Sequence, residues 1–226
     1  MPAPARQRSK EQPRMERRVF LVLAAGMVVL PKMMSRQSGE AIAEDVDIDA
    51  ILRDPDAPLT GGPDRDVVLA SFSDYNCPFC KAAESDLKRL VREDGKVGIV
   101  RKDWPILTDA SLYGARLALA ARYQDRYDAV HEALMSVPGV RIPQEQMLAA
   151  IRAADVDSDR LLDDLHAHAA EIDALLARND AQARKLELKG TPSYLIGRRL
   201  YNTLDFGGFS AAIANARRQS APEGAS

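Results

Sequence analysis

The sequence predicts an α/β domain into which a block of helices is inserted, and three observations carry this prediction. Strand-like and helix-like segments alternate between residues 66 and 102. Residues 108–186 contain only helical patterns, rich in Ala, Leu, Arg, Glu and Asp. A pair of strand-like segments and one helix then follow, so the α/β pattern resumes after the helical block. At 226 residues, of which 46% are hydrophobic, the chain is long enough for one domain with such an insertion.

The first half of the α/β pattern is predicted to be a βαβ unit. A short helix is expected near Ile48–Arg53, ahead of a turn rich in proline and glycine. Asp66–Phe72 (DVVLASF) is a run of β-branched and apolar residues, which is typical of a buried strand. Lys81–Glu93 then has helical spacing, and Lys96–Lys102 (KVGIVRK) predicts a second strand. A strand, a helix and a strand in close succession indicate a βαβ unit.

The remaining elements complete the domain. We expect about four helices within residues 108–186. Pro192–Thr203 (PSYLIGRRLYNT) predicts a β-hairpin that turns near Gly197-Arg198, and a last helix is expected over Gly208–Arg218. The chain is therefore divided into an export signal and linker (1–43), a first α/β part with the cysteines (44–107), an inserted helical domain (108–186), a second α/β part (187–218) and a disordered tail (219–226).

The N-terminal segment predicts export. Basic residues precede a run of twelve apolar residues, Val19–Leu30, which is too short to span a bilayer but typical of a secretory signal. Arg17–Leu21 (RRVFL) resembles a twin-arginine export signal. Ala41–Ala43 has the small-x-small pattern of a cleavage site but lies well past the apolar run, so an uncleaved membrane anchor stays open. The net charge is −2 and no basic stripe follows, which argues against nucleic-acid binding.

The two cysteines of the chain, Cys77 and Cys80, lie in one C-x-x-C motif. A disulfide across two intervening residues closes a very short loop and is therefore a poor structural staple. The motif follows a predicted strand and opens a helix, so Cys77 is expected at the N-cap or first turn, where free N–H groups and the helix dipole favour a thiolate. Pro78 suits the first helical position. We expect Cys77 to be the exposed thiolate and Cys80 its more buried resolving partner.

Zinc binding is the alternative use of two such cysteines. Structural zinc takes four ligands, and the only histidines are His131, His166 and His168. His166 and His168 are two positions apart on a predicted helix and point to different faces. His131 is expected at the surface or its boundary. We therefore expect neither a metal nor another cofactor.

Three motifs follow one another along the chain: FSDYNCPFCK (Phe72–Lys81), DWPIL (Asp103–Leu107) and GTPSYLIG (Gly190–Gly197). Together they resemble those of DsbA-like thiol–disulfide oxidoreductases, which belong to the thioredoxin-fold superfamily. The resemblance implies a thioredoxin fold with an inserted helical domain. It also implies that the Thr191–Pro192 bond is cis and close to the cysteines, where Thr191 offers backbone groups to a substrate peptide.

The chain departs from that family pattern at two positions. Ser71 stands where many relatives carry a buried glutamate, six positions before the first cysteine. Proton transfer would then need water or another group, for which Asp74 and Lys102 are candidates. Phe79 stands between the cysteines where strong oxidants of the family often have histidine, so we expect a less extreme thiolate at Cys77.

The resemblance implies a periplasmic thiol:disulfide oxidoreductase, first of all an oxidase. Its Cys77–Cys80 disulfide would pass to exported cysteine-containing polypeptides, and a membrane quinone-linked partner would reoxidise it. One alternative is an isomerase or reductase kept reduced; such relatives often oligomerise through a long N-terminal arm, for which this chain leaves little length, so we expect a monomer. Another alternative is a redox-silent protein that binds peptides or a metal, against which Pro78 and the Thr191–Pro192 pair argue.

Overall fold

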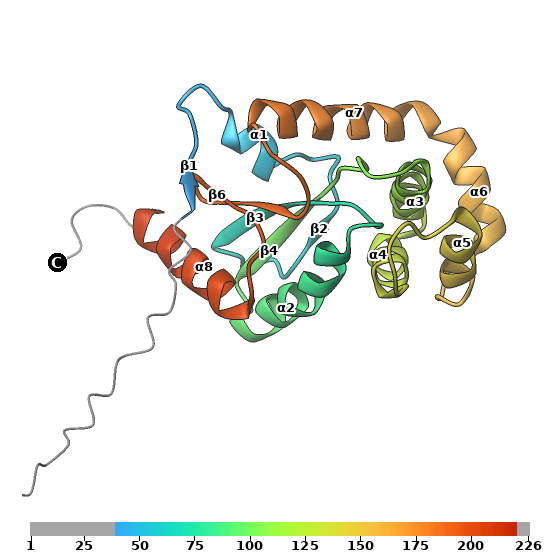
Figure 1. The fold of residues 1–226 in the computed structure, drawn as a ribbon, viewed down its shortest axis with the longest axis horizontal. Coiled ribbons are helices and arrows are strands. Elements are labelled where there is room, and N and C mark those ends of the chain that lie inside the picture. The colour runs from blue at the N-terminus through green and yellow to red at the C-terminus, as the bar shows by residue number, and fades with distance from the viewer. Residues whose placement is uncertain (1–38, 221–226) are drawn as a thin grey trace, which may run out of the picture. The chain divides into compact units, whose positions relative to one another are not determined.

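The computed structural model describes residues 39–220, which are built around one mixed sheet with strand order β1-β6-β5-β3-β4-β2 (Figure 1). The two longest strands, β3 (Val67–Ser73) and β4 (Val97–Asp103), are neighbours and run parallel, as the crossover through a helix requires. β5 (Ser193–Ile196) runs antiparallel to β3 and forms the expected hairpin with β6 (Arg199–Tyr201).

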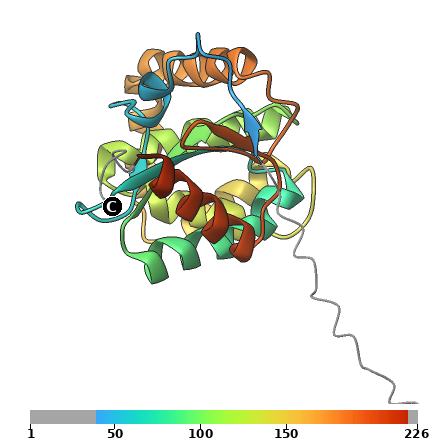
Figure 2. The same ribbon diagram turned by 90° about the vertical axis from the view of Figure 1, so that its left-hand side faces the viewer.

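Helices cover both faces of this sheet (Figures 1 and 2). Helices α2 (Pro78–Asp94) and α8 (Phe206–Ser220) lie on one face, while α1 (Ile48–Leu52) and α7 (Ala169–Lys185) lie on the other. Because successive side chains of a strand point to opposite faces, each central strand supplies both layers of the core. In β3, Val67 and Leu69 pack against α2 and α8, whereas Ala70 and Phe72 pack against α1 and α7.

The helical insertion lies between β4 and β5, as predicted, but it is divided more finely than expected. It consists of α3 (Asp109–Ala120), a 3₁₀ turn η1 (Ala121–Gln124), α4 (Tyr127–Ser136), α5 (Gln144–Arg152), α6 (Ser158–Ala167) and α7. Within the described residues this makes five α-helices rather than about four. The additional break falls at His168, where α6 ends and α7 begins. No proline or glycine at this position predicts the break from the sequence.

The ends of the described region also differ from the expected linker and tail. Glu40–Ala41 forms a short strand, β1, that pairs antiparallel with β6, and Leu59–Thr60 forms β2 at the other edge. Helix α8 begins at Phe206 and continues to Ser220, so it is longer than expected at both ends. Residues 1–38, which make up most of the predicted export signal and linker (1–43), and residues 221–226 lie outside the described residues. No helix within residues 39–220 is long and apolar enough to cross a bilayer.

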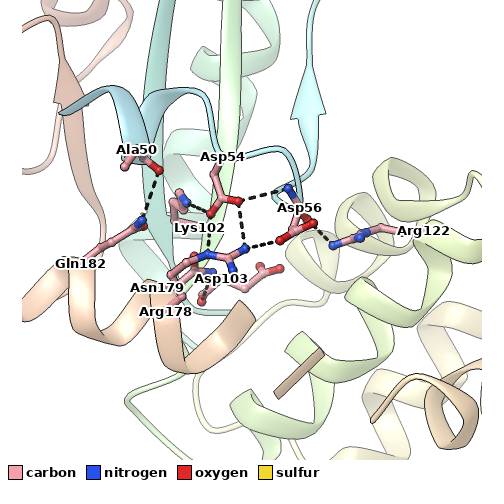
Figure 3. A network of polar contacts seen from close by, with 9 residues as sticks. All are labelled: Ala50, Asp54, Asp56, Lys102, Asp103, Arg122, Arg178, Asn179 and Gln182. Carbon is pink, nitrogen blue, oxygen red and sulfur yellow. Dashed lines mark hydrogen bonds and ion pairs between the residues drawn. The ribbon is translucent and has the colours of Figure 1, made fainter. Parts of the chain in front are cut away.

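A buried ionic network ties the insertion to the sheet on the α7 face (Figure 3). The Asp54 carboxylate accepts hydrogen bonds from Lys102 at 2.6 Å and from Arg178 at 2.9 and 3.0 Å. Burial raises the pKa of Asp54, but these two cations outweigh it and the pKa is lowered. The network thus joins the segment after α1, strand β4 and helix α7, and it engages Lys102 on the face of the sheet opposite α2.

Candidate active site

Helix α2 begins at the C-x-x-C motif in the manner that its sequence predicts. Cys77 is the N-cap, with extended backbone angles, and Pro78 occupies the first helical turn. The Cys77 sulfur accepts a hydrogen bond from the backbone N–H of Cys80 at 3.3 Å. The thiol therefore takes the place that a serine or aspartate side chain has in an ordinary N-cap.

The turn before Cys77 is fastened to two neighbouring loops. Asp74 accepts hydrogen bonds from the backbone N–H groups of Asn76 (2.7 Å), Ile106 (2.8 Å) and Leu107 (3.0 Å). The Asn76 side chain accepts one from the backbone N–H of Ile142 at 2.6 Å. Because these bonds satisfy buried backbone groups, they fix both loops beside the motif.

These loops and the motif present apolar side chains to solvent. Of the six large hydrophobic side chains exposed within residues 39–220, four are Phe79 (60%), Val140 (60%), Leu107 (48%) and Ile106 (44%). Lys81, one turn into α2, holds the loop that carries Val140 by donating to the carbonyls on either side of Pro138. An apolar rim, defined as Phe79, Ile106, Leu107 and Val140, therefore surrounds the start of α2.

The loop before β5 faces the first cysteine. The Thr191–Pro192 bond is cis, which confirms the expectation from the resemblance. The Cys77 thiol donates a hydrogen bond to the Thr191 carbonyl at 3.2 Å, although 114 positions separate the two residues. The fold thus brings Thr191 and Pro192 to Cys77, as predicted.

The two thiols differ in acidity more than in exposure. Hydrogen bonding, chiefly from the Cys80 side chain and also from the N–H groups of Cys80 and Phe79, lowers the pKa of Cys77 to about 6 against the effect of burial. Burial raises the pKa of Cys80, and its neighbour Cys77 raises it further. The expectation that Cys77 is exposed was wrong: Cys77 is 2% exposed and Cys80 3%, because the Thr191 loop and the helical insertion cover both.

The two candidates for proton transfer, Asp74 and Lys102, are hydrogen-bonded to groups other than the cysteines. Asp74 directs its carboxylate at three backbone N–H groups, and Lys102 is paired with Asp54 on the far face of the sheet. Ser71 is buried and lies beside Arg101 in the β3–β4 register.

Sequence reasoning misplaced His131, which is 1% exposed rather than at the surface. Its Nδ1 lies 3.0 Å from the Tyr75 hydroxyl, and its Nε2 lies 3.3 Å from the Glu84 carboxylate. The signal available in the sequence was the four-residue spacing of Tyr127 and His131, whose rings stack on the apolar face of α4.

The structure also bears on the role of His168 and on metal binding. His168 stacks on Tyr123 with ring centroids 3.5 Å apart. Within residues 39–220, no group of three or more His, Cys, Asp or Glu side chains is arranged to hold a metal ion.

A thiol that ionises near neutral pH, next to one that keeps its proton, is what thiol–disulfide exchange requires. The fold, with a C-x-x-C pair of free thiols at the start of α2, places the chain in the DsbA-like class of thioredoxin-fold proteins.

Residues 53–215 match a family model described as thioredoxin, and the chain belongs to this family. A thioredoxin-like oxidoreductase from Silicibacter pomeroyi is 36% identical, with a TM-score of 0.72 over 76% of this chain and 99% of that one. The thiol-disulfide exchange protein alpha-DsbA2 from Wolbachia pipientis is 29% identical, with a TM-score of 0.69 over 74% and 90% of the two chains. These similarities confirm the thioredoxin-like fold with an inserted helical region.

Curated relatives are 25–30% identical. Probable disulfide bond formation protein D from Bacillus anthracis is 26% identical over 68% of this chain and 75% of its own length. The chain spans only 25% of the length of the first curated relatives that it matches, Na(+)/H(+) antiporters from Salinispora arenicola and Salinispora tropica.

Proposed function

We propose that the protein is an exported oxidase that passes its Cys77–Cys80 disulfide to the cysteines of exported polypeptides. The observation that carries this proposal is the pKa of Cys77, lowered to about 6 chiefly by hydrogen bonding from Cys80. A low pKa makes Cys77 a good leaving group and stabilises the reduced protein, which drives electrons from substrate to enzyme.

The reaction has two steps that balance in electrons and protons. A substrate thiolate attacks the Cys77 sulfur, the Cys77–Cys80 bond breaks, and the bonding pair goes to Cys80, which takes up one proton because burial raises its pKa. A second substrate thiolate then attacks the substrate sulfur of the mixed disulfide. Cys77 leaves as a thiolate, and the substrate has lost two electrons.

The substrate is proposed to be an extended polypeptide segment. The carbonyl of Thr191 lies at the Cys77 sulfur, where an incoming backbone can pair with Thr191 beside Pro192. The apolar rim around Phe79 would hold hydrophobic side chains of unfolded chains without demanding a particular sequence. Phe79→Ser should therefore raise KM several-fold for a reduced polypeptide and leave the rate with glutathione unchanged; equal effects on both would contradict this role.

Export through the N-terminal signal is part of the proposal, as are a membrane quinone-linked partner that reoxidises the protein and a monomeric state. The support is the charged lead and short apolar run that precede the described residues. Replacing Arg17 and Arg18 by Lys should trap the protein in the cytoplasm if it uses the twin-arginine route. Delivery that is unchanged by this substitution would indicate the general secretory route.

The reduction potential measured against glutathione tests the direction of exchange. A value near −120 mV supports an oxidase, whereas a value near −270 mV supports a thioredoxin-like reductant. The same protein should form disulfides in a reduced, unfolded polypeptide. Cys77→Ser is the matched control without the sulfur that is attacked. Cys80→Ser, first converted by oxidised glutathione to the Cys77–glutathione mixed disulfide, should release glutathione to a single-cysteine polypeptide and accumulate the Cys77–polypeptide mixed disulfide. No trapped species would indicate a redox-silent protein.

A further inference from the structure

A buried polar cluster lies where α2, β4 and the helical insertion meet. We call it the Glu84 cluster, and it consists of Glu84 on α2, Arg101 on β4, His131 on α4 and Tyr75 in the turn before Cys77. Arg101 donates two hydrogen bonds to the Glu84 carboxylate, both at 2.9 Å. The side chains of Glu84, Arg101 and His131 are only 7%, 4% and 1% exposed. A charged group so deeply buried is costly unless it is fully paired, so its presence calls for a reason.

The cluster is adjacent to the active site through two elements. Glu84 follows Cys80 by four positions on α2, so the two side chains lie one helical turn apart on the same buried face. Tyr75 precedes Cys77 by two positions and packs in one apolar cluster with both cysteines. Arg101 lies beside Ser71 in the sheet, and both side chains point to the α2 face.

Within the cluster, the His131 imidazole lies between Tyr75 and Glu84, and its two charged neighbours keep a fixed charge. Glu84 stays ionised, because His131 and Arg101 outweigh the effect of burial and hold its pKa at about 2. The guanidinium of Arg101 stays charged as well. An imidazole, in contrast, gains or loses a proton near neutrality. The Nε2 atom of His131 makes no well-formed hydrogen bond, so its contact with Glu84 depends on charge rather than on a fixed donor.

The exchange reaction creates a negative charge that a nearby positive charge would stabilise. When a thiolate attacks Cys77, the bonding pair goes to Cys80, and a transient anion appears in a site where burial disfavours it. We propose that His131 is a positioning residue for this step: its imidazolium compensates the Glu84 carboxylate, stabilises the departing Cys80 thiolate and thereby sets the pH dependence of the exchange. This inference rests on the exchange at Cys77 and Cys80, not on its direction, so the reduction potential that decides between oxidase and reductase leaves it intact.

Several other titratable groups lie near His131 and are present whether its imidazole is neutral or charged. Asp103 on β4 contributes to its electrostatic environment, and burial raises the pKa of Asp103. Tyr127 lies one turn away on α4 and donates to Asp103, while Tyr75 shares a hydrogen bond with Nδ1. Burial keeps the two tyrosines protonated, so they add no charge beside the imidazole.

The test measures the rate at which glutathione opens the Cys77–Cys80 disulfide between pH 5 and 9, divided by the thiolate fraction of glutathione. The wild type should show an inflection, with faster exchange on the acid side. His131→Gln should lack the inflection and be slower by roughly tenfold on the acid side, the order expected when one compensating charge is lost at an effective dielectric constant of about 20. His168→Gln is the matched control, since His168 stacks on Tyr123 outside the cluster, and it should keep the wild-type profile. An unchanged inflection in His131→Gln would overturn the proposal.

A second measurement does not depend on the folding of a variant. The ring protons of His131 are followed by NMR across the same pH range in the oxidised and reduced wild-type protein. We expect a higher titration midpoint in the reduced form, because the Cys77 thiolate adds a negative charge nearby. The same midpoint in both forms, or an imidazole that does not titrate, would contradict the coupling.

Discussion

Oxidation of the Cys77–Cys80 pair removes an ionisable thiol, so the stability difference between reduced and oxidised protein should change with pH. In the reduced protein, hydrogen bonding chiefly from Cys80 lowers the pKa of Cys77 from 9.0 to about 6. A group whose pKa is lower in the folded state contributes its full stability above the unfolded pKa and loses it as the pH falls through the folded pKa. The reduced form should therefore gain on the oxidised form between about pH 6 and 9.

The gain in the free energy of unfolding is about 1 kcal/mol for each pH unit in this window, after allowing for solvent screening of the thiolate. The disulfide joins residues 77 and 80, and chain entropy assigns so short a loop about 2 kcal/mol. At pH 6 the contribution of the disulfide to stability exceeds that of the Cys77 thiolate, so the oxidised form is more stable. We expect the two stabilities to become equal between about pH 7 and 8.5, and the reduced form to be more stable above that.

Urea unfolding of both redox forms at pH 5.5, 7.0 and 8.5, at matched ionic strength, measures this difference. Apart from His131, which the preceding proposal couples to the redox state, the other titrating groups are present in both forms and largely cancel. A variant with both cysteines replaced by serine reports the pH dependence of the remaining protein. A difference between redox forms that stays constant across this range would refute the assignment of Cys77 as an ionised thiol in the folded protein.

Two further predictions concern the thiols and the network of Figure 3. Iodoacetamide should alkylate Cys77 before Cys80 in the reduced protein at neutral pH, because only the pKa of Cys77 is lowered, and the opposite order by mass spectrometry would reverse their roles. Lys102→Met should lower the free energy of unfolding by about 3 kcal/mol, because it leaves the buried Asp54 with one cation fewer. Arg116→Ala, at an exposed ion pair, should cost less than about 1 kcal/mol, and equal urea midpoints for these two variants would contradict the importance of burial.

The parts of the fold that the sequence predicts are those with local causes. Apolar runs of strand length predict β3 and β4, and Pro78 after Cys77 predicts where α2 begins. The cis bond before Pro192 and its proximity to Cys77 came from the family resemblance rather than from local pattern.

The parts that the sequence does not predict depend on partners far along the chain. His131 is buried because Tyr75 and Glu84, from other elements, supply its contacts, and neither partner is recognisable from the α4 sequence. Lys102 lies in a strand whose alternation assigns its face, but its partner Asp54 is 48 positions away. Such long-range pairs have no periodicity that a single sequence reveals.

The two-residue strand β1 would give cleavage of the leader proposed above a structural consequence. Glu40 and Ala41 close one edge of the sheet by pairing with β6, and the Gly39 carbonyl accepts a hydrogen bond from Arg199 at 2.7 Å. A cut after Ala43, where the small-x-small pattern lies, would remove this strand. It would also open the wall of a cavity of about 600 Å³ that residues 39–43 help to line. The backbone groups of β6 would then be free to pair with another chain, which is how unprotected sheet edges begin to aggregate. Cleavage before Gly39, or no cleavage, would leave that edge covered, so the position of any cut would determine whether the protein exposes an unpaired sheet edge.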